Sequence, residues 1–190
     1  MAVSTLPAVN GYRFTVAQYD KMIESGIFCE DKHVELIDGE VVQLAAMGNK
    51  HISIINRSNM LFTDKLRDVA IVGVQTPVRL NDRSEPEPDI SILQPRSDFY
   101  AGAKPTPADV FFLIEISDST LAFDRGIKIS LYARANVAEA WLVDVEAETL
   151  TVYRDPSPDG YRTIQTLRRG DRISLTAFPG REIAVTEILG

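Results

Sequence analysis

With 190 residues, 45% of them hydrophobic and 25% charged, the chain has the composition of a soluble globular protein that can bury a core of its own. Its formal net charge of −7 argues against strong nonspecific DNA binding, which depends on neutralising phosphates with lysine and arginine. The sequence has no window near the roughly 18 apolar residues of a membrane span, and its single cysteine, Cys29, excludes an internal disulfide and a cysteine zinc cluster. We therefore expect one cytoplasmic domain over residues 1–190, with residues 1–13 as a flexible arm.

The N-terminal part predicts a helix followed by a β-hairpin. Thr15 and Gln18 have capping-box spacing, so we expect a helix over about residues 16–25 that stops at Gly26. The segments HVELI and EVVQL then flank Asp38-Gly39, which is a strong signal for a tight hairpin turn. Within this hairpin, Glu35 falls on the opposite face from its apolar neighbours.

A second helix and a buried central strand are predicted next. Asn49 is a candidate cap for a helix to about Arg67, whose apolar residues near helical spacing are Ile52, Ile55, Leu61, Phe62 and Leu66. Strand-like segments follow at 71–80 and 89–93, and then a loop over 95–108 that contains several Gly, Lys and Pro residues. The run 110–116 is apolar on both faces, which suits a central strand covered on both sides.

The C-terminal part predicts one more helix and several strands. Asp124 is a candidate cap for a helix to about Ala135, with an inward stripe of Ile127, Leu131 and Tyr132. AWLVDV and LTVYRD are typical of adjacent strands, and residues 160–190 of two or three more. This order favours a mixed α/β fold, with a mixed central β-sheet flanked by helices and an N-terminal helix and hairpin. The sequence has no glycine-rich phosphate loop, G-x-S-x-G elbow or H-E-x-x-H helix, which removes several enzyme classes.

An acidic run, Glu85-Pro-Glu87-Pro-Asp89, carries the most specific chemistry. Glu85 and Glu87 each precede a proline and are therefore extended, so the three carboxylates are expected on one side of a strand. Glu115 ends the central apolar run, and beside Asp89 it would complete a site for a hard cation such as Mg²⁺, as in a metal-dependent hydrolase. The alternative is that Asp89 starts a strand and Glu115 forms an ion pair, although a carboxylate after five apolar residues is costly unless it is paired or metal-bound.

Four other polar residues each have a structural and a functional interpretation. Lys128 follows Asp124 by four residues, so it either forms a helical ion pair or reaches the attacking water and the scissile phosphate. Glu35 either lies on the outer face of the hairpin or adds a metal ligand. His51 and Arg125 are either solvated or bind the substrate phosphate, and His51 could also move a proton.

Two further groups of side chains, one aromatic and one of arginines, have a structural interpretation, and the arginines also have a functional one. Trp141, Tyr132 and Tyr153 are assigned to packing in the core and at the surface. Six arginines gather in the C-terminal quarter, where they form either a solvated surface or an edge that faces phosphates; they are Arg154, Arg162, Arg168, Arg169, Arg172 and Arg181.

Several segments together resemble a known family. They are VELIDGEVV, the helix with His51, PEPDISIL, FFLIEISDST and DRGIKISLYARANVAEAWLVD. They are similar to the Uma-two family of proposed restriction endonucleases, once filed as a domain of unknown function, abundant in cyanobacteria and part of the PD-(D/E)xK nuclease superfamily. The resemblance covers about residues 14–190 and is most specific from Glu115 to Asp144. It implies a restriction-endonuclease-like core whose mixed sheet carries the acidic residues.

The resemblance also implies a site and a reaction. Asp89 matches the family's acidic residue after proline, and Glu115 matches its second acidic ligand. With the Ile116 backbone carbonyl they would hold Mg²⁺ or Mn²⁺, and Glu35 would be a further ligand. Lys128 matches the lysine of the following helix, which would position or deprotonate the attacking water. The implied reaction is hydrolysis of a DNA phosphodiester, by a homodimer if two symmetric sites cut two strands.

Two departures from the superfamily pattern leave other functions open. Ser117 stands where a lysine is expected two residues after the second acid, and Asp118 stands where many relatives have proline. Activity then depends on Lys128 reaching Asp89 and Glu115 from its helix. The alternatives are a weakened nuclease-fold module that binds nucleic acid or protein, and a hydrolase of another phosphoester.

Overall fold

The computed structural model describes residues 11–28 and 33–190, so Cys29 and residues 1–10 of the predicted arm lie outside the described residues. The helices are α1 (Val16–Glu24), α2 (Asn49–Leu66), α3 (Leu121–Phe123), α4 (Ile129–Arg134) and α5 (Val185–Leu189), with a 3₁₀ turn η1 (Pro107–Asp109) and a π-helical turn η2 (Asp124–Lys128). The strands are β1 (Val34–Ile37), β2 (Glu40–Gln43), β3 (Ile71–Val74), β4 (Ile90–Leu93), β5 (Val110–Ser117), β6 (Glu139–Asp144), β7 (Thr149–Ser157), β8 (Gly160–Arg168), β9 (Arg172–Ser174) and β10 (Glu182–Ala184).

The centre of the fold is a six-stranded mixed sheet with the strand order β3-β4-β5-β6-β7-β8. Only β5 and β6 are parallel within this sheet, and the other neighbours are antiparallel. β1 pairs with β2, and β9 with β10, in two separate small sheets. The predicted mixed central sheet is confirmed, and the predicted central strand is β5.

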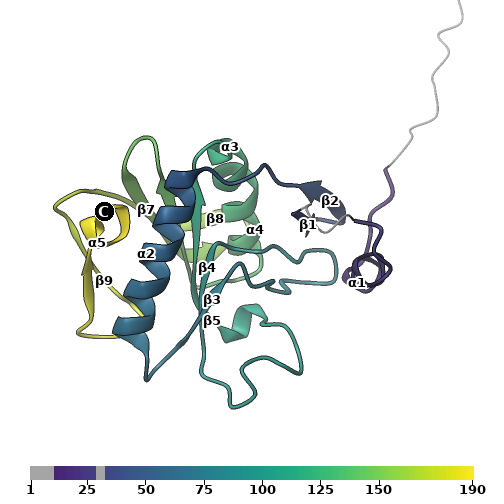
Figure 1. The fold of residues 1–190 in the computed structure, drawn as a ribbon, viewed down its shortest axis with the longest axis horizontal. Coiled ribbons are helices and arrows are strands. Elements are labelled where there is room, and N and C mark those ends of the chain that lie inside the picture. The colour runs from purple at the N-terminus through teal and green to yellow at the C-terminus, as the bar shows by residue number, and fades with distance from the viewer. Residues whose placement is uncertain (1–10, 29–32) are drawn as a thin grey trace, which may run out of the picture.

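Helices cover both faces of the sheet (Figure 1). On one face, Phe62 of α2 lies edge-on to Phe112 of β5 and Trp141 of β6, with ring centroids 5.6 and 5.9 Å apart. On the other face, Tyr132 of α4 packs in a second cluster with Leu142 of β6. Because β5 and β6 are buried on both faces, they anchor the strand ends that carry the acidic residues.

The N-terminal elements α1, β1 and β2 lie beside the sheet rather than on it (Figure 1). The predicted capping box is confirmed, since the Thr15 hydroxyl accepts from the Gln18 N–H and the Gln18 side chain accepts from the Thr15 N–H. The hairpin turn is also confirmed, with φ of 47° at Asp38 and 81° at Gly39. A Cβ at Gly39 would lie 2.8 Å from the Cβ of Arg13, so a larger residue is excluded there by space as well as by φ.

Three predicted elements differ from those observed. The strand expected over 71–80 ends at Val74, because Gln75 has φ of 47° and leaves the extended region. Gly48 caps α2 and Asn49 is its first residue, while Ile52, expected to face inward, is 40% exposed. Residues 185–189 form α5 where strands were expected. Within the described part of the chain, no helix combines the length and apolar composition needed to cross a membrane.

Candidate functional site

Asp89 and Glu115 lie at the same end of two neighbouring strands. In the β4–β5 pairing Ile90 is opposite Ile114, which places Asp89, directly before β4, alongside Glu115. Asp89 Oδ2 accepts a hydrogen bond of 2.8 Å from the Ile116 N–H, and Asp89 Oδ1 lies 3.0 Å from His51 Nε2. A central strand therefore fixes the Asp89 carboxylate on one side and the first turn of α2 fixes it on the other.

Lys128 reaches the site from the helical segment that follows β5. Its Nζ lies 2.9 Å from Glu115 Oε1 and 3.1 Å from Glu35 Oε1, and all three side chains are at most 3% exposed. The Tyr132 hydroxyl donates a second hydrogen bond to Glu115 Oε1. The site thus contains one buried ammonium between two buried carboxylates, and the helical pair with Asp124 does not account for Lys128.

Glu35 faces inward from the hairpin, so the interpretation that placed it on an outer, solvated face is wrong. Its Oε1 accepts from the Glu87 N–H at 2.9 Å as well as from Lys128. Its Oε2 is buried and has no hydrogen-bond partner within residues 11–28 and 33–190. A buried carboxylate oxygen without a partner carries a free-energy penalty, which marks this position as one that a further donor or cation would stabilise.

A π-helical turn explains how Lys128 points to Glu115. Asp124 was predicted to cap a regular helix, but the helical segment already begins at Leu121 and Asp124 lies within it as the first residue of η2. The Asp124 carboxylate is buried and accepts hydrogen bonds of 2.6 Å from the Ser117 and Thr120 hydroxyls. Ser117 stands at the strand position where a lysine was expected. Its hydrogen bond to Asp124 therefore links the first residue of this turn to the end of β5. The π-turn ends at Lys128 and leaves Ile127, expected to face inward, 43% exposed.

The charges of the site shift several pKa values. Burial raises the pKa of Glu115 well above its usual range; Lys128 opposes this rise, and the carboxylates of Asp124 and Asp89 add to it. Burial alone would lower the pKa of Lys128, but the two glutamates beside it raise that pKa, so Lys128 is an ammonium ion here. Burial likewise opposes protonation of His51, yet its contact with Asp89 raises the pKa of the imidazole. Negative charge therefore exceeds positive charge at this end of the sheet.

Two residues singled out in the sequence lie outside the site. Glu85 forms an isolated bridge with Leu36 instead of extending β4, so the alternation of a regular strand does not apply and the expected convergence of three carboxylates is wrong. The Glu85 carboxylate instead pairs with Arg79, at 2.9 Å, and with Lys104. Arg125 lies 3.7 Å from Asp144 and is half exposed, away from the acidic pocket.

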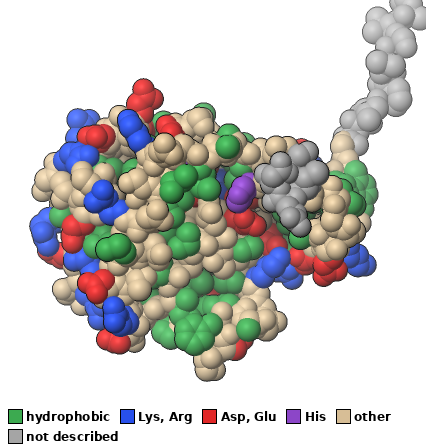
Figure 2. Space-filling view, in the orientation of Figure 1, with side chains coloured by type: hydrophobic (Ala, Val, Ile, Leu, Met, Phe, Trp, Pro, Cys, Tyr) green, Lys and Arg blue, Asp and Glu red, His purple; other side chains and the backbone are tan. Residues whose placement is uncertain are grey.

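Asp89, Glu115, Lys128 and His51 line a small pocket of about 60 Å³ together with residues of neighbouring segments. Its acidic wall includes Glu87 and Asp118 in addition to Asp89 and Glu115, and the segment Leu44–Gly48 forms an apolar wall. This space is large enough for water molecules, an ion or a phosphate oxygen. Figure 2 shows acidic side chains beside a histidine where the N-terminal elements meet the sheet.

The carboxylates that line the pocket are the type of oxygen ligand that a hard divalent cation prefers. Within residues 11–28 and 33–190, no three His, Cys, Asp or Glu side chains are arranged as a ready metal site. Between Glu35 and Glu115 lies the ammonium of Lys128. The partnerless Glu35 Oε2 and the carboxylates that raise the pKa of Glu115 nevertheless supply the oxygen ligands and the surplus negative charge that Mg²⁺ and Mn²⁺ prefer.

The sequence interpretation missed part of the site. Tyr132 was assigned to packing and Asp124 to a cap, yet both are buried beside Glu115 and Lys128. A usable signal was present, since Tyr132 follows Lys128 by four residues and therefore shares its helix face. Asp124 precedes Lys128 by the same spacing, but its hydrogen bonds to Ser117 and Thr120 depend on a π-turn that residue spacing does not reveal.

Comparisons with known proteins identify the family and support the fold. The Uma2 family model, described as "Putative restriction endonuclease", matches residues 16–186. Among solved structures, the chain is similar to a crystal structure described as "a putative nuclease belonging to DUF820" from Anabaena variabilis, with a TM-score of 0.70 and 17% identity over 93% of this chain and 97% of that one. At that identity the likeness concerns the fold. The comparison with curated proteins gives no match.

Proposed function

The chain belongs to the Uma2 family, and from this premise we propose that it is a divalent-ion-dependent nuclease that hydrolyses DNA phosphodiester bonds. The observation that carries the proposal is the position of Lys128, whose ammonium lies 2.9 Å from Glu115 although the strand position for a lysine holds Ser117. A catalytic role would explain why an ammonium ion, which is costly to bury, lies beside these two carboxylates.

The acidic residues would hold the ion. We assign Asp89, Glu115 and the Ile116 carbonyl as ligands of Mg²⁺ or Mn²⁺, with Glu35 as a further ligand. When bound, such an ion supplies a more acidic water and stabilises charge on the phosphoryl oxygen. The Ile116 N–H supports this assignment by holding Asp89 Oδ2, which fixes the carboxylate at the mouth of the pocket.

Lys128 and His51 act on the substrate and the water. Because its neighbours raise its pKa, Lys128 acts as a cation that positions the attacking water and stabilises developing negative charge, rather than as a base. His51 lines the pocket with its Nε2 on Asp89, where it can donate to a phosphate oxygen or move a proton to the leaving group. The Tyr132 hydroxyl holds Glu115 in place from the side of α4.

Cleavage of DNA tests the proposal. Purified protein is incubated with supercoiled and linear DNA with Mg²⁺, with Mn²⁺ or with a chelator. We expect cutting that requires the ion and that is lost in Asp89→Asn, which keeps the shape of the side chain but removes its charge. Glu24→Gln, which also removes one negative charge, at an exposed residue of α1, serves as the control and should cut as the wild type does. Equal background cutting by all three proteins would contradict the proposal.

The small pocket of about 60 Å³, which fits a phosphate group rather than a length of duplex, supports a second candidate, hydrolysis of another phosphoester. Release of nitrophenol from bis(p-nitrophenyl) phosphate, without any cutting of DNA, would favour that candidate. We also propose a homodimer, because two symmetric sites serve the cutting of two strands. Light scattering that gives the mass of one chain would contradict the dimer.

A further inference from the structure

The exposed face of α2 differs in charge from the rest of the molecule. The chain has 27 acidic residues and a formal charge of −7. In contrast, the 18 residues of α2 include a single acid, Asp64, near the C-terminal end. Apart from Ile52, the exposed side chains of its first half are amides, hydroxyls and cations, with Lys50, Ser53 and Arg57 on one side of the helix at i, i+3 and i+7.

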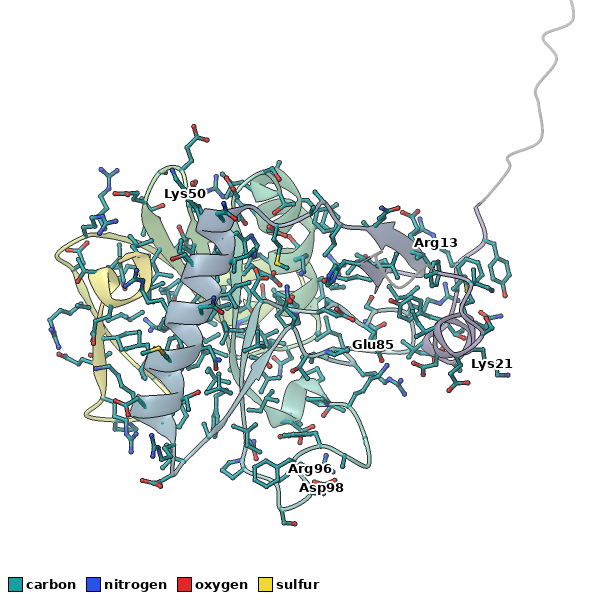
Figure 3. The ribbon with its side chains drawn as sticks, in the orientation of Figure 1. Arg13, Lys21, Lys50, Glu85, Arg96 and Asp98 are labelled. Carbon is teal, nitrogen blue, oxygen red and sulfur yellow. The ribbon has the colours of Figure 1, made fainter. Side chains whose placement is uncertain are left out.

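Two grooves run along this helix and meet at Ser53. One, of about 340 Å³, is lined by Lys50 in the first turn and by Arg169. The other, of about 840 Å³, continues along the helix past Arg57. The first groove begins one residue away from the acidic pocket along α2, since Lys50 lines the groove and His51 lines the pocket and contacts Asp89. Figure 3 shows Lys50 at the end of α2 that begins the helix.

Lys50 and Arg57 form no ion pair with a side chain of residues 11–28 and 33–190, although Glu148 lines the same groove as Lys50. Ion pairs near this face involve Lys65, Arg67 and Arg169 instead. Of the six C-terminal arginines, Arg154, Arg169 and Arg172 each pair with a glutamate. The cations of α2 differ from that edge in their place, because they lie on the helix whose His51 contacts Asp89.

We infer that the exposed face of α2, represented by Lys50, Ser53 and Arg57, binds the phosphodiester backbone of the DNA whose scissile phosphate enters the acidic pocket. The inference rests on the proposed nuclease function. It assigns to α2 the DNA backbone that adjoins the scissile phosphate on one side. Lysine and arginine release condensed counter-ions when they contact phosphates, and hydroxyls and amides donate to phosphate oxygens. At 1.5 Å per residue α2 is about 27 Å long, so it can follow several successive phosphates.

Salt-dependent binding tests this surface. Binding of a fluorescein-labelled DNA duplex of mixed sequence is measured by anisotropy over a range of salt concentrations, in an Asp89→Asn background so that cutting does not interfere. Each lost phosphate contact lowers the slope of log K against log salt by about 0.9. We therefore expect the Lys50→Gln/Arg57→Gln double variant to lose about two units of slope. Lys21→Gln, on the far side of the molecule (Figure 3), should keep the slope of the parent.

The outcomes separate this inference from the proposed function. A double variant with the slope and affinity of the parent overturns the inference, as does an equal loss in Lys21→Gln. In either case, ion-dependent DNA cutting by the wild type would leave the nuclease proposal standing. If the parent does not bind DNA and the wild type does not cut it, both proposals fail. The three substituted side chains are exposed, so unchanged circular dichroism and melting temperatures will confirm that folding is not the cause.

Discussion

Substitution of Lys128 by methionine removes one positive charge and keeps a side chain of similar length. In the wild type that charge lies 2.9 Å from Glu115 and 3.1 Å from Glu35, and none of the three side chains is more than 3% exposed. Removing one partner of a buried ion pair leaves an uncompensated charge and typically costs about 3–5 kcal/mol. The Tyr132 hydroxyl still donates to Glu115, which limits the loss, so we expect a value near the lower end of this range.

The loss should depend on pH in a defined direction. Burial raises the pKa of Glu115 in the folded state, and removal of Lys128 raises it further because the ammonium opposes the shift. A carboxyl group with a raised folded pKa binds its proton more tightly when folded. Its contribution to stability is present below the unfolded pKa and is lost as pH rises through the folded pKa. The variant should therefore be closest to the wild type in acid and furthest from it in neutral and alkaline solution.

Urea unfolding at about pH 5 and about pH 8 measures both effects. Lys21→Met is the matched control, since it removes the same charge from an exposed position on α1 and should stay within about 0.5 kcal/mol of the wild type. A Lys128→Met variant as stable as this control at both pH values would refute the buried ion-pair arrangement. A loss that shrinks with rising pH would refute the electrostatic explanation.

Three further changes test neighbouring parts of the structure, each by its free energy of unfolding. Tyr132→Phe removes a hydrogen bond to the buried carboxylate of Glu115 and should cost about 1.5–3 kcal/mol. Glu85→Gln leaves Arg79 and Lys104 without their buried partner and should cost about 1–3 kcal/mol. Glu40→Gln, in an exposed ion pair with Arg13, is the control and should cost under about 0.5 kcal/mol. Equal losses in the two variants would contradict this expectation. Gly39→Ala should cost at least about 1–2 kcal/mol because φ is 81° there, and a neutral result would mean that the turn relaxes.

The sequence predicted the elements whose signals are local. The capping box at Thr15, the turn at Asp38-Gly39 and the apolar run of β5 each depend on a few adjacent residues, and each is observed. The pairing of Asp89 with Glu115 was also accessible, since it requires only that two strands carrying acids become neighbours.

The remaining features depend on contacts between distant segments. Glu85 was expected beside Asp89, but a bridge to Leu36 and cations from two other segments direct it elsewhere. The inward position of Glu35 depends on how the hairpin packs against the sheet. The π-turn that directs Lys128 inward depends on Asp124 binding hydroxyls from the end of β5 and the turn after it. Periodicity in one segment carries no information about such contacts.

The claim that Lys128 supplies the missing catalytic lysine is tested most directly by DNA cleavage with the Lys128→Ala variant. The wild type, Asp89→Asn, Lys128→Ala and Lys21→Ala are compared with Mg²⁺ and with Mn²⁺, at a temperature where circular dichroism shows all four to be folded. The account predicts that Lys128→Ala loses about 10²-fold or more in rate and approaches Asp89→Asn, while Lys21→Ala cuts as the wild type does. Cutting by folded Lys128→Ala at the wild-type rate would contradict it.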